Sequence, residues 1–376
     1  MMINRILQDI IDSKFSLNKA IIILGPRQVG KTTLLKQLIN KNRPDVFWLN
    51  ADKIEDRSLF CDHGFNNLLS FIADKKYLII DEAQRIENVG LKLKILYDET
   101  DIQIIATGSS SFDLSNRVNE PLTGRKLQYN LYPFSFEELA AAFGTFEEYK
   151  KLNTRLIYGA YPDVVLQPGH QRELLENLAS SYLYKDILEW DLVKNSNKLL
   201  KLLQALAFQI GNQVSYNELG KLIKTSSVTV ENYIDLLEKS FVVFTLPSFS
   251  RNHRNELKKS KKIYFYDNGI RNALINNFNN IDLRNDTGAL WENYIISERV
   301  KYTEYHQIYA NRYFWRTRTK QEIDYIEERE GKLFAYEFKW NTHKKAKIPK
   351  SFIEAYPDAE VKIITPDNYI DFITKK

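Results

Sequence analysis

The feature that most constrains this sequence is the pattern G-x-x-x-x-G-K-T, spelled by Gly25-Pro26-Arg27-Gln28-Val29-Gly30-Lys31-Thr32. It follows the apolar run Ala20–Leu24 and precedes Thr33–Leu38, a stretch typical of a helix. In that context the glycines let the backbone curl, so that successive N–H groups converge on a phosphate at a helix N-terminus. A chance glycine-containing turn is the alternative, and the strand and helix on either side argue against it. The segment predicts a nucleoside triphosphate site.

The predicted ATP-binding residues run from Gly25 to Thr33. Lys31 is expected to bring positive charge to the β- and γ-phosphates, and Thr32 to offer its hydroxyl to Mg²⁺. The expected cofactors are therefore ATP and Mg²⁺.

Composition limits the class of protein without identifying a partner. A chain of 376 residues is too long for one ordinary core, so two or three domains are expected. The formal net charge of +5 is too small to predict nucleic-acid binding by itself. Cys61 is the single cysteine, which excludes a disulfide scaffold and is typical of a reducing compartment. With no apolar run near the ~18 residues of a membrane span and no signal-peptide pattern, we expect a cytoplasmic protein without a membrane partner.

Short apolar runs alternate with helical stretches over the first third of the chain, which predicts a parallel α/β sheet. The expected strands are Ala20–Leu24, Val46–Asn50, Tyr77–Asp81, Ile102–Thr107 and Leu127–Leu131. The third run delivers Asp81 and Glu82 to the edge of the sheet beside the loop after the first strand. We expect Asp81 to ligate Mg²⁺ through water, and Glu82 to orient and deprotonate the attacking water. A helix N-cap is the alternative role for this pair.

Other polar residues of this region are candidates for contacts with the γ-phosphate. Thr107 or Ser109, at the end of the fourth run, would touch the γ-phosphate or the water, although a serine-rich turn is the alternative. Arg117 and Arg125 are candidates for an arginine that neutralises transition-state charge, either in cis or from a neighbouring subunit of a homo-oligomer.

Six stretches carry a specific resemblance: Leu78–Gln84, Ala106–Ser111, Leu122–Arg125, Leu131–Leu139, Gly159–Val165 and Tyr182–Ile187. Together they resemble a large prokaryotic family of AAA-type ATPases, and the resemblance runs nearly from end to end of the chain. It implies an ATP-binding AAA-like protein with a C-terminal domain of unassigned function. It does not imply a substrate.

The middle of the chain has the element pattern of a winged helix. The expected helices are Leu199–Ile210, Tyr216–Ile223 and Val228–Glu238, and the expected wing strands are Phe241–Leu246 and Ile263–Tyr266. A helix-turn-helix normally suggests DNA in the major groove. The outward side of the third helix, however, is expected to carry Glu231, Asp235 and Glu238, which would repel phosphates. A packing module is therefore favoured over a DNA-reading helix.

Two weaker signals for nucleic acid remain in this region. Thr229 and Asn232 are the base-reading candidates on the third helix. The run from Arg251 to Lys262 is rich in basic residues, which is typical of either an electrostatic footprint or a solvated loop.

Two alternating runs near the C-terminus, Glu322–Ile326 and Leu333–Lys339, predict a hairpin closed by Glu330-Gly331. A two-residue loop sets Asp324 opposite Glu337 and Glu322 opposite Lys339, with all four groups on one face. Two carboxylates can hold a divalent cation, and a lysine can steady the attacking water or the scissile phosphate. A salt-bridged strand pair is the alternative.

Upstream of the hairpin, Asp286-Thr287-Gly288 opens a predicted helix that contains Glu292. A helix glutamate followed by D…E-x-K on a hairpin resembles the PD-(D/E)xK nuclease superfamily. The resemblance implies Glu292, Asp324 and Glu337 as metal ligands and Lys339 as the catalytic lysine. The stretch Trp315–Lys320 and the lysines at 344, 345, 347 and 350 add groups suited to a nucleic-acid backbone.

The expected fold class is therefore α/β: a P-loop, AAA-like ATPase core (1–140), a helical extension (141–196), a winged helix (197–268) and a restriction-nuclease-like domain (269–376). ATP turnover would gate or move something bound by the rear two domains, with DNA as the expected partner. Two alternatives stay open. One is a nucleotide-dependent signalling or scaffold protein with an inactive nuclease fold, and the other is a DNA-dependent motor that does not cleave.

Overall fold

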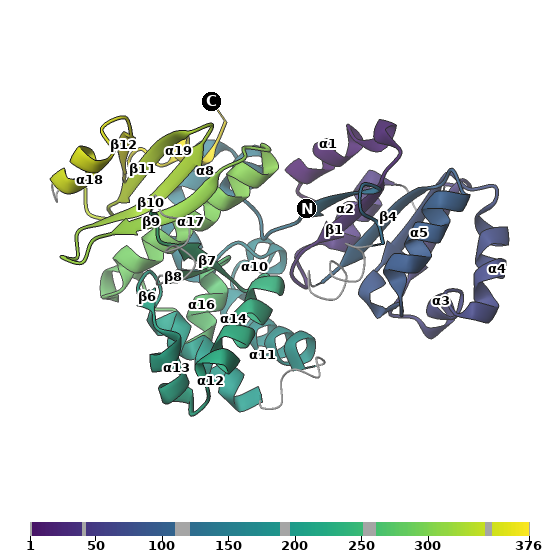
Figure 1. The fold of residues 1–376 in the computed structure, drawn as a ribbon, viewed down its shortest axis with the longest axis horizontal. Coiled ribbons are helices and arrows are strands. Elements are labelled where there is room, and N and C mark those ends of the chain that lie inside the picture. Colours follow the sequence, from purple (N-terminus) through teal and green to yellow (C-terminus); the bar gives the residue numbers. More distant parts are fainter. Residues whose placement is uncertain are drawn as a thin grey trace. The chain divides into compact units, whose positions relative to one another are not determined.

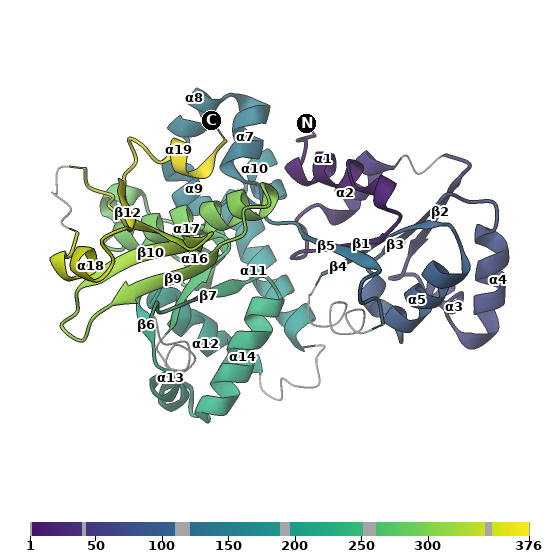
Figure 2. The same ribbon diagram turned by 45° about the horizontal axis from the view of Figure 1, so that its top comes forward.

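A computed structural model describes residues 2–39, 43–109, 121–188, 196–250, 261–342 and 348–375. The chain forms two compact units, Met1–Tyr132 with Lys239–Phe241, and Pro133–Glu238 with Val242–Lys376. Figure 1 and Figure 2 label the elements of both units, which we take one at a time. Arg117, Ser110 and Ser111 lie outside the described residues, as do Arg251–Ser260 and the lysines at 344, 345 and 347.

The N-terminal unit is built on a parallel sheet with the strand order β2-β3-β4-β1-β5. Its strands are β1 (Ala20–Leu24), β2 (Val46–Asn50), β3 (Tyr77–Asp81), β4 (Gln103–Gly108) and β5 (Lys126–Asn130). The predicted parallel sheet is confirmed, and only the fourth and fifth strands differ from the expected bounds, by one residue. The central strands are largely apolar and almost wholly buried because both faces of the sheet are covered.

Helices connect these strands (Figure 1). They are α2 (Lys31–Leu38), α3 (Ile54–Ser58), α4 (Asp62–Ile72) and α5 (Val89–Glu99), while α1 (Ile6–Asp12) precedes β1. In a parallel sheet the carboxyl ends of all strands lie at one edge, so the segments after β1, β3 and β4 are neighbours. The motif residues of the sequence therefore meet at that edge.

The C-terminal unit begins with helices and continues into a small antiparallel sheet of order β6-β8-β7. The expected elements of the middle region are present in the expected order, as α12 (Ser196–Phe208), α13 (Tyr216–Ile223), α14 (Ser227–Lys239), β7 (Val243–Pro247) and β8 (Lys261–Phe265). A short strand that the sequence did not predict, β6 (Gln213–Val214), lies between α12 and α13. The other helices before the last sheet are α7 (Phe136–Phe143), α8 (Thr145–Lys150), α9 (Leu152–Tyr158), α10 (Pro162–Leu166), α11 (Gln171–Leu188) and α16 (Asn268–Leu274). None of the described helices has the length and hydropathy needed to cross a membrane.

The rest of the C-terminal unit is a four-stranded mixed sheet of order β12-β11-β10-β9. Its elements are α17 (Thr287–Tyr305), β9 (Asn311–Arg316), β10 (Glu322–Arg329), β11 (Lys332–Phe338), α18 (Lys350–Ala355), β12 (Glu360–Ile364) and α19 (Ile370–Ile373). Residues 325–329 of β10 pair with 336–332 of β11, which confirms the predicted hairpin register. Glu330 and Gly331 both have positive φ, 49° and 76°, as a type I′ turn requires.

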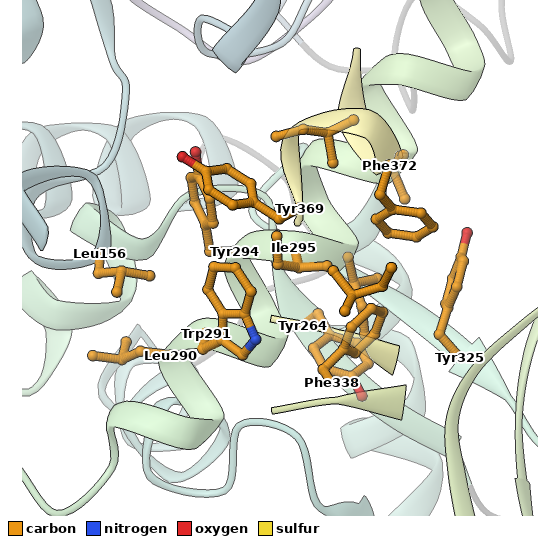
Figure 3. Packing of buried hydrophobic residues seen from close by; sticks show 14 of the residues in the cluster. Leu156, Tyr264, Leu290, Trp291, Tyr294, Ile295, Tyr325, Phe338, Tyr369 and Phe372 are labelled. Carbon is orange, nitrogen blue, oxygen red and sulfur yellow. The ribbon is translucent and has the colours of Figure 1, made fainter. Parts of the chain in front are cut away.

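Two hydrophobic clusters hold this sheet. The larger one joins α17 to the sheet and to α19, and Trp291, Tyr325, Phe338 and Phe372 are among its members (Figure 3). The smaller cluster packs Phe352 of α18 against Trp315, Ile323, Ile326 and Ala335. Trp315 is 8% exposed and its ring lies edge-on to Phe352, so the prediction that it offers an aromatic group to a nucleic-acid backbone is wrong.

Candidate nucleotide site and carboxylate cluster

The loop between β1 and α2 holds Lys31 in a buried position. The Lys31 ammonium donates to the carbonyl oxygens of Gly25 and Pro26, each at 3.0 Å. Gly30 has a φ of 97°, and a Cβ at Gly25 would lie 2.3 Å from the Leu131 oxygen. Both motif glycines are therefore needed, one for its backbone conformation and one for close packing.

Thr32, Asp81 and Thr107 form a tight cluster at the carboxyl edge of the sheet. Thr32 Oγ1 donates to Asp81 Oδ2 at 2.6 Å, and Thr107 Oγ1 donates to Asp81 Oδ1 at 2.5 Å. A hydroxyl and a carboxylate brought together from two elements are the oxygen ligands that Mg²⁺ prefers. The donor set of Thr32 and Asp81 therefore fits the Mg²⁺ that accompanies a nucleoside triphosphate.

Glu82 follows Asp81 in a left-handed backbone conformation, with φ at 55°. The Gln84 amide donates to Glu82 Oε2 at 2.6 Å and to Ser109 Oγ at 3.0 Å, and the Lys31 ammonium lies 3.9 Å from Glu82 Oε1. Glu82 precedes a short 3₁₀ helix, Ala83–Arg85, without capping it through a side-chain hydrogen bond. The alternative reading of Glu82 as a helix cap therefore lacks support.

Two residues of this site have no signal in the sequence motifs. Gln84 links Glu82 to Ser109, and its buried Oε1 has no partner within the described part of the chain. Arg5 is 5% exposed and donates to the Val29 oxygen at 2.9 Å and to the Tyr132 oxygen, which ties the phosphate loop to the segment after β5. Arg5 precedes α1, far from the motif in sequence, so only the fold reveals its position.

Arg125 lies at the end of the sheet where the strands begin, opposite the end that carries the phosphate loop. It precedes β5, its carbonyl accepts from Ala20 at the start of β1, and its guanidinium is 2.8 Å from Asp98. The phosphate loop follows the end of β1, so Arg125 cannot reach it within its own domain. The cis role is therefore wrong, and a role across a subunit boundary stays a prediction.

The third helix of the middle region is less acidic on its outer side than expected. Glu231, Asp235 and Asn232 are exposed, as predicted. Glu238 instead accepts from the Thr245 backbone at 2.7 Å and from the Thr245 hydroxyl. Burial raises the pKa of Glu238, and its placement on the outward side is wrong.

In the C-terminal unit, Glu292 of α17, Asp324 of β10 and Glu337 of β11 lie close enough to affect one another's charge. Burial first, and then the charges of Glu292 and Glu337, raise the pKa of Asp324 well above its ordinary value. Lys339 Nζ donates to Glu337 Oε1 at 2.6 Å, and Asp324 Oδ2 accepts from the Phe338 backbone at 2.9 Å. The four residues that resemble a nuclease site are thus gathered in one cluster.

Two residues of β8 that were not expected at this cluster reach into it. Lys262 Nζ lies 3.1 Å from Glu292 Oε1 and also contacts Glu322, whose other oxygen is 3.2 Å from Arg316. Tyr264 donates its hydroxyl to Glu292 Oε1 at 2.6 Å. Glu322 is therefore paired with Lys262 and Arg316, and not with the predicted Lys339.

The cluster does not fit a divalent cation as it stands. Glu292 is engaged by Lys262 and Tyr264, and Glu337 by Lys339. The described residues contain no group of three or more His, Cys, Asp or Glu side chains arranged to hold a metal ion. The metal role predicted for Glu292, Asp324 and Glu337 is therefore not what this arrangement favours.

Three segments of the chain match known protein families, and relatives from two organisms match most of its length. Residues 17–140 match the sequence model of a family described as AAA domain, while 149–281 and 287–371 match two families described as domains of unknown function, DUF8612 and DUF4143. An uncharacterised protein of Methanocaldococcus jannaschii is 26% identical over 94% of this chain and 84% of its own. Another, from Mycobacterium tuberculosis, is 24% identical over 85% of this chain and 70% of its own.

Two solved structures have a weaker likeness. A Walker-type ATPase of Pyrococcus abyssi is 17% identical, with 73% of this chain and 96% of that chain covered and a TM-score of 0.49. The Holliday junction branch migration motor RuvB of Thermotoga maritima is 16% identical, with 68% and 95% covered and a TM-score of 0.32. At these scores the two structures say nothing about function. The family match shows that residues 17–140 are similar to AAA-type domains.

Proposed function

We propose that this chain, which carries an AAA-type domain at residues 17–140, binds ATP with Mg²⁺ and hydrolyses it. The observation that carries the proposal is the 2.6 Å contact between Thr32 Oγ1 and Asp81 Oδ2, beside a loop that presents Lys31. This contact brings together the phosphate loop, which contains Thr32, and the acidic end of β3, which contains Asp81. P-loop ATPases hold Mg²⁺ with one residue from each of these two motifs.

Each residue has a distinct task in this proposal. The backbone N–H groups from Gly25 to Thr33 and the Lys31 ammonium bind the phosphates. A bound Mg²⁺, held by Thr32 and Asp81, supplies charge neutralisation. Glu82 orients the water and accepts its proton, and the Gln84 amide, which donates to Oε2, leaves Oε1 for that task. Thr107 contacts Asp81 and the Glu82 backbone N–H, so it supports the two acids directly.

Phosphate release from ATP tests this proposal. The full-length chain should hydrolyse ATP only with Mg²⁺, and Asp81→Asn should lose most of that activity because its amide no longer carries the charge that holds the metal. The matched control is Asp74→Asn, an exposed acid ahead of the same strand. Equal turnover by Asp81→Asn and wild type would contradict the assignment.

For the rest of the chain we infer a winged helix followed by a nuclease-like domain that interacts with DNA under the control of the ATPase cycle. The support is the order of elements in the middle region and the gathering of Glu292, Asp324, Glu337 and Lys339 on one helix and one hairpin. The domain boundaries proposed above, at 140, 196 and 268, follow from this reading.

A second candidate is a nucleotide-dependent signalling or scaffold protein in which the nuclease-like domain binds but does not cut. The contacts of Lys262 with two carboxylates of the cluster favour it. A DNA-dependent motor that does not cleave is the third possibility. Cleavage assays with Mg²⁺ or Mn²⁺ on single-stranded, duplex and branched DNA, with and without ATP, separate a nuclease from both.

A further inference from the structure

We infer that the ammonium of Lys262 takes the place of a divalent cation in the carboxylate cluster, so that the C-terminal domain neutralises this site internally and takes up neither Mg²⁺ nor Mn²⁺. The inference rests on the nuclease-like arrangement proposed above, and it goes further by assigning the cation of that arrangement to a side chain. Its consequence is a domain that presents a nuclease-like surface without metal-dependent cleavage.

The position of Lys262 is fixed by the fold. β8 is the central strand of its sheet, where Lys262 is paired with Gln213 on one side and Leu246 on the other. Its side chain is 2% exposed, and the ammonium lies 5.4 Å from the centre of the Phe314 ring. Strand pairing on both sides and burial of the side chain therefore keep the Lys262 ammonium beside the carboxylates.

The charge of Lys262 is secured by its neighbours. Burial opposes that charge, but the nearby Glu292, Asp324 and Glu322 outweigh burial and raise the pKa of Lys262. Tyr264 donates a second hydrogen bond to the oxygen of Glu292 that Lys262 contacts. The carboxylate expected to ligate a metal therefore already has a cation and a hydroxyl as partners.

The remaining carboxylate oxygens of the cluster lie beside a positive charge that is already in place. Glu337 Oε2 is the one carboxylate oxygen of the cluster that is buried without a hydrogen-bond partner among the described residues. Mg²⁺ keeps several of its own waters and is bound in proteins through one or two carboxylates. At this cluster such an ion would lie beside the buried ammonium of Lys262, whose positive charge repels it and already neutralises the carboxylates.

Mn²⁺ binding to the nucleotide-free full-length chain tests the inference, with free Mn²⁺ followed by its paramagnetic resonance signal. Wild type and Asp324→Asn should bind the same number of Mn²⁺ ions. Lys262→Met should gain one ion per chain, and the double variant with Asp324→Asn should lose it again. Lys261→Met is the matched control, because the neighbouring Lys261 faces the Tyr216 ring instead of the cluster, and it should gain none.

Two results of the Mn²⁺ measurement would overturn the inference. One is an Mn²⁺ ion bound by wild type and lost in Asp324→Asn, a comparison that does not depend on whether Lys262→Met folds. The other is a folded Lys262→Met, or Lys262→Gln, that binds no additional ion. A nuclease activity of wild type that depends on Asp324 would also contradict the inference. ATP hydrolysis, measured on the same preparations, separates all of these results from a failure of the ATPase proposal.

Discussion

Among single residues, Lys31 should matter most for nucleotide binding, because it is the motif-placed cation beside the β- and γ-phosphates. Its ammonium donates hydrogen bonds to the carbonyl oxygens of Gly25 and Pro26, within the loop that would hold the phosphates. We predict that Lys31→Ala abolishes tight ATP binding in a calorimetric titration. Lys36→Ala, an exposed lysine of the same helix, should bind ATP as wild type does. Near-normal affinity in Lys31→Ala would rule out the loop assignment.

The raised pKa of Asp324 predicts that the stability of the folded chain depends on pH. Because its pKa is raised above the ordinary value of 3.8, the folded chain binds the Asp324 proton more tightly than the unfolded chain does. Stability should therefore fall as pH rises from 3.8 through the folded pKa. Asp324→Asn removes the buried charge and should melt at a higher temperature than wild type at neutral pH, with the gap closing on acidification. Melting curves in EDTA check this, and a lower melting temperature for Asp324→Asn at neutral pH would contradict it.

The residues of both sites differ in how far the sequence could predict them. Lys31, Thr32, Asp81 and Glu82 occupy fixed motif positions, and the fold brings all four to one edge of the sheet. Lys262 belongs to another strand and sequence region, and nothing in its neighbourhood in the chain points to Glu292. Such pairings depend on tertiary packing, which local patterns do not encode.

At the level of secondary structure, the β10–β11 hairpin depends on its turn. Gly331 has a φ of 76°, and nothing lies within 4 Å of a Cβ built on it, so only backbone strain opposes a side chain there. We predict that Gly331→Ala lowers the free energy of unfolding by about 1–2 kcal/mol. Gly288 has equally open space but lies in α17, so Gly288→Ala should be neutral or stabilising. Denaturant titration of both variants checks the contrast, and equal losses would refute it.

The same hairpin shows what an element-level pattern predicts and what it misses. Alternation and the two-residue loop predicted the register that pairs Tyr325 with Tyr336. They did not predict the irregularity in the pairing of β10 with β9, which falls between Ile323 and Ile326 and so includes Asp324 and Tyr325. Such an irregularity reorients side chains and depends on the neighbouring strand, so the sequence of β10 alone does not reveal it.

At the level of the whole molecule, the proposal links an ATPase domain to a region that interacts with DNA, formed by the proposed winged helix and nuclease-like domain at residues 197–376. If the ATPase cycle controls that region, DNA that binds one nucleotide state better than another shifts the chain toward that state, and the rate of ATP hydrolysis should change with it. We predict that DNA stimulates phosphate release by the full-length chain, in a salt-dependent manner. The rate should be compared across single-stranded, duplex and branched DNA at constant ionic strength. No response to any of them would favour the scaffold function.

The most direct test of ATP hydrolysis at this site is single-turnover hydrolysis by Glu82→Gln. Its amide can still orient water but cannot accept the proton, so we expect ATP binding to be retained and the rate to fall by about 10²–10⁴-fold. Glu87→Gln, an exposed acid a few residues on, should hydrolyse ATP at the wild-type rate. A fall of about tenfold or less in Glu82→Gln would contradict the role of Glu82 as general base and, with it, the proposed active site.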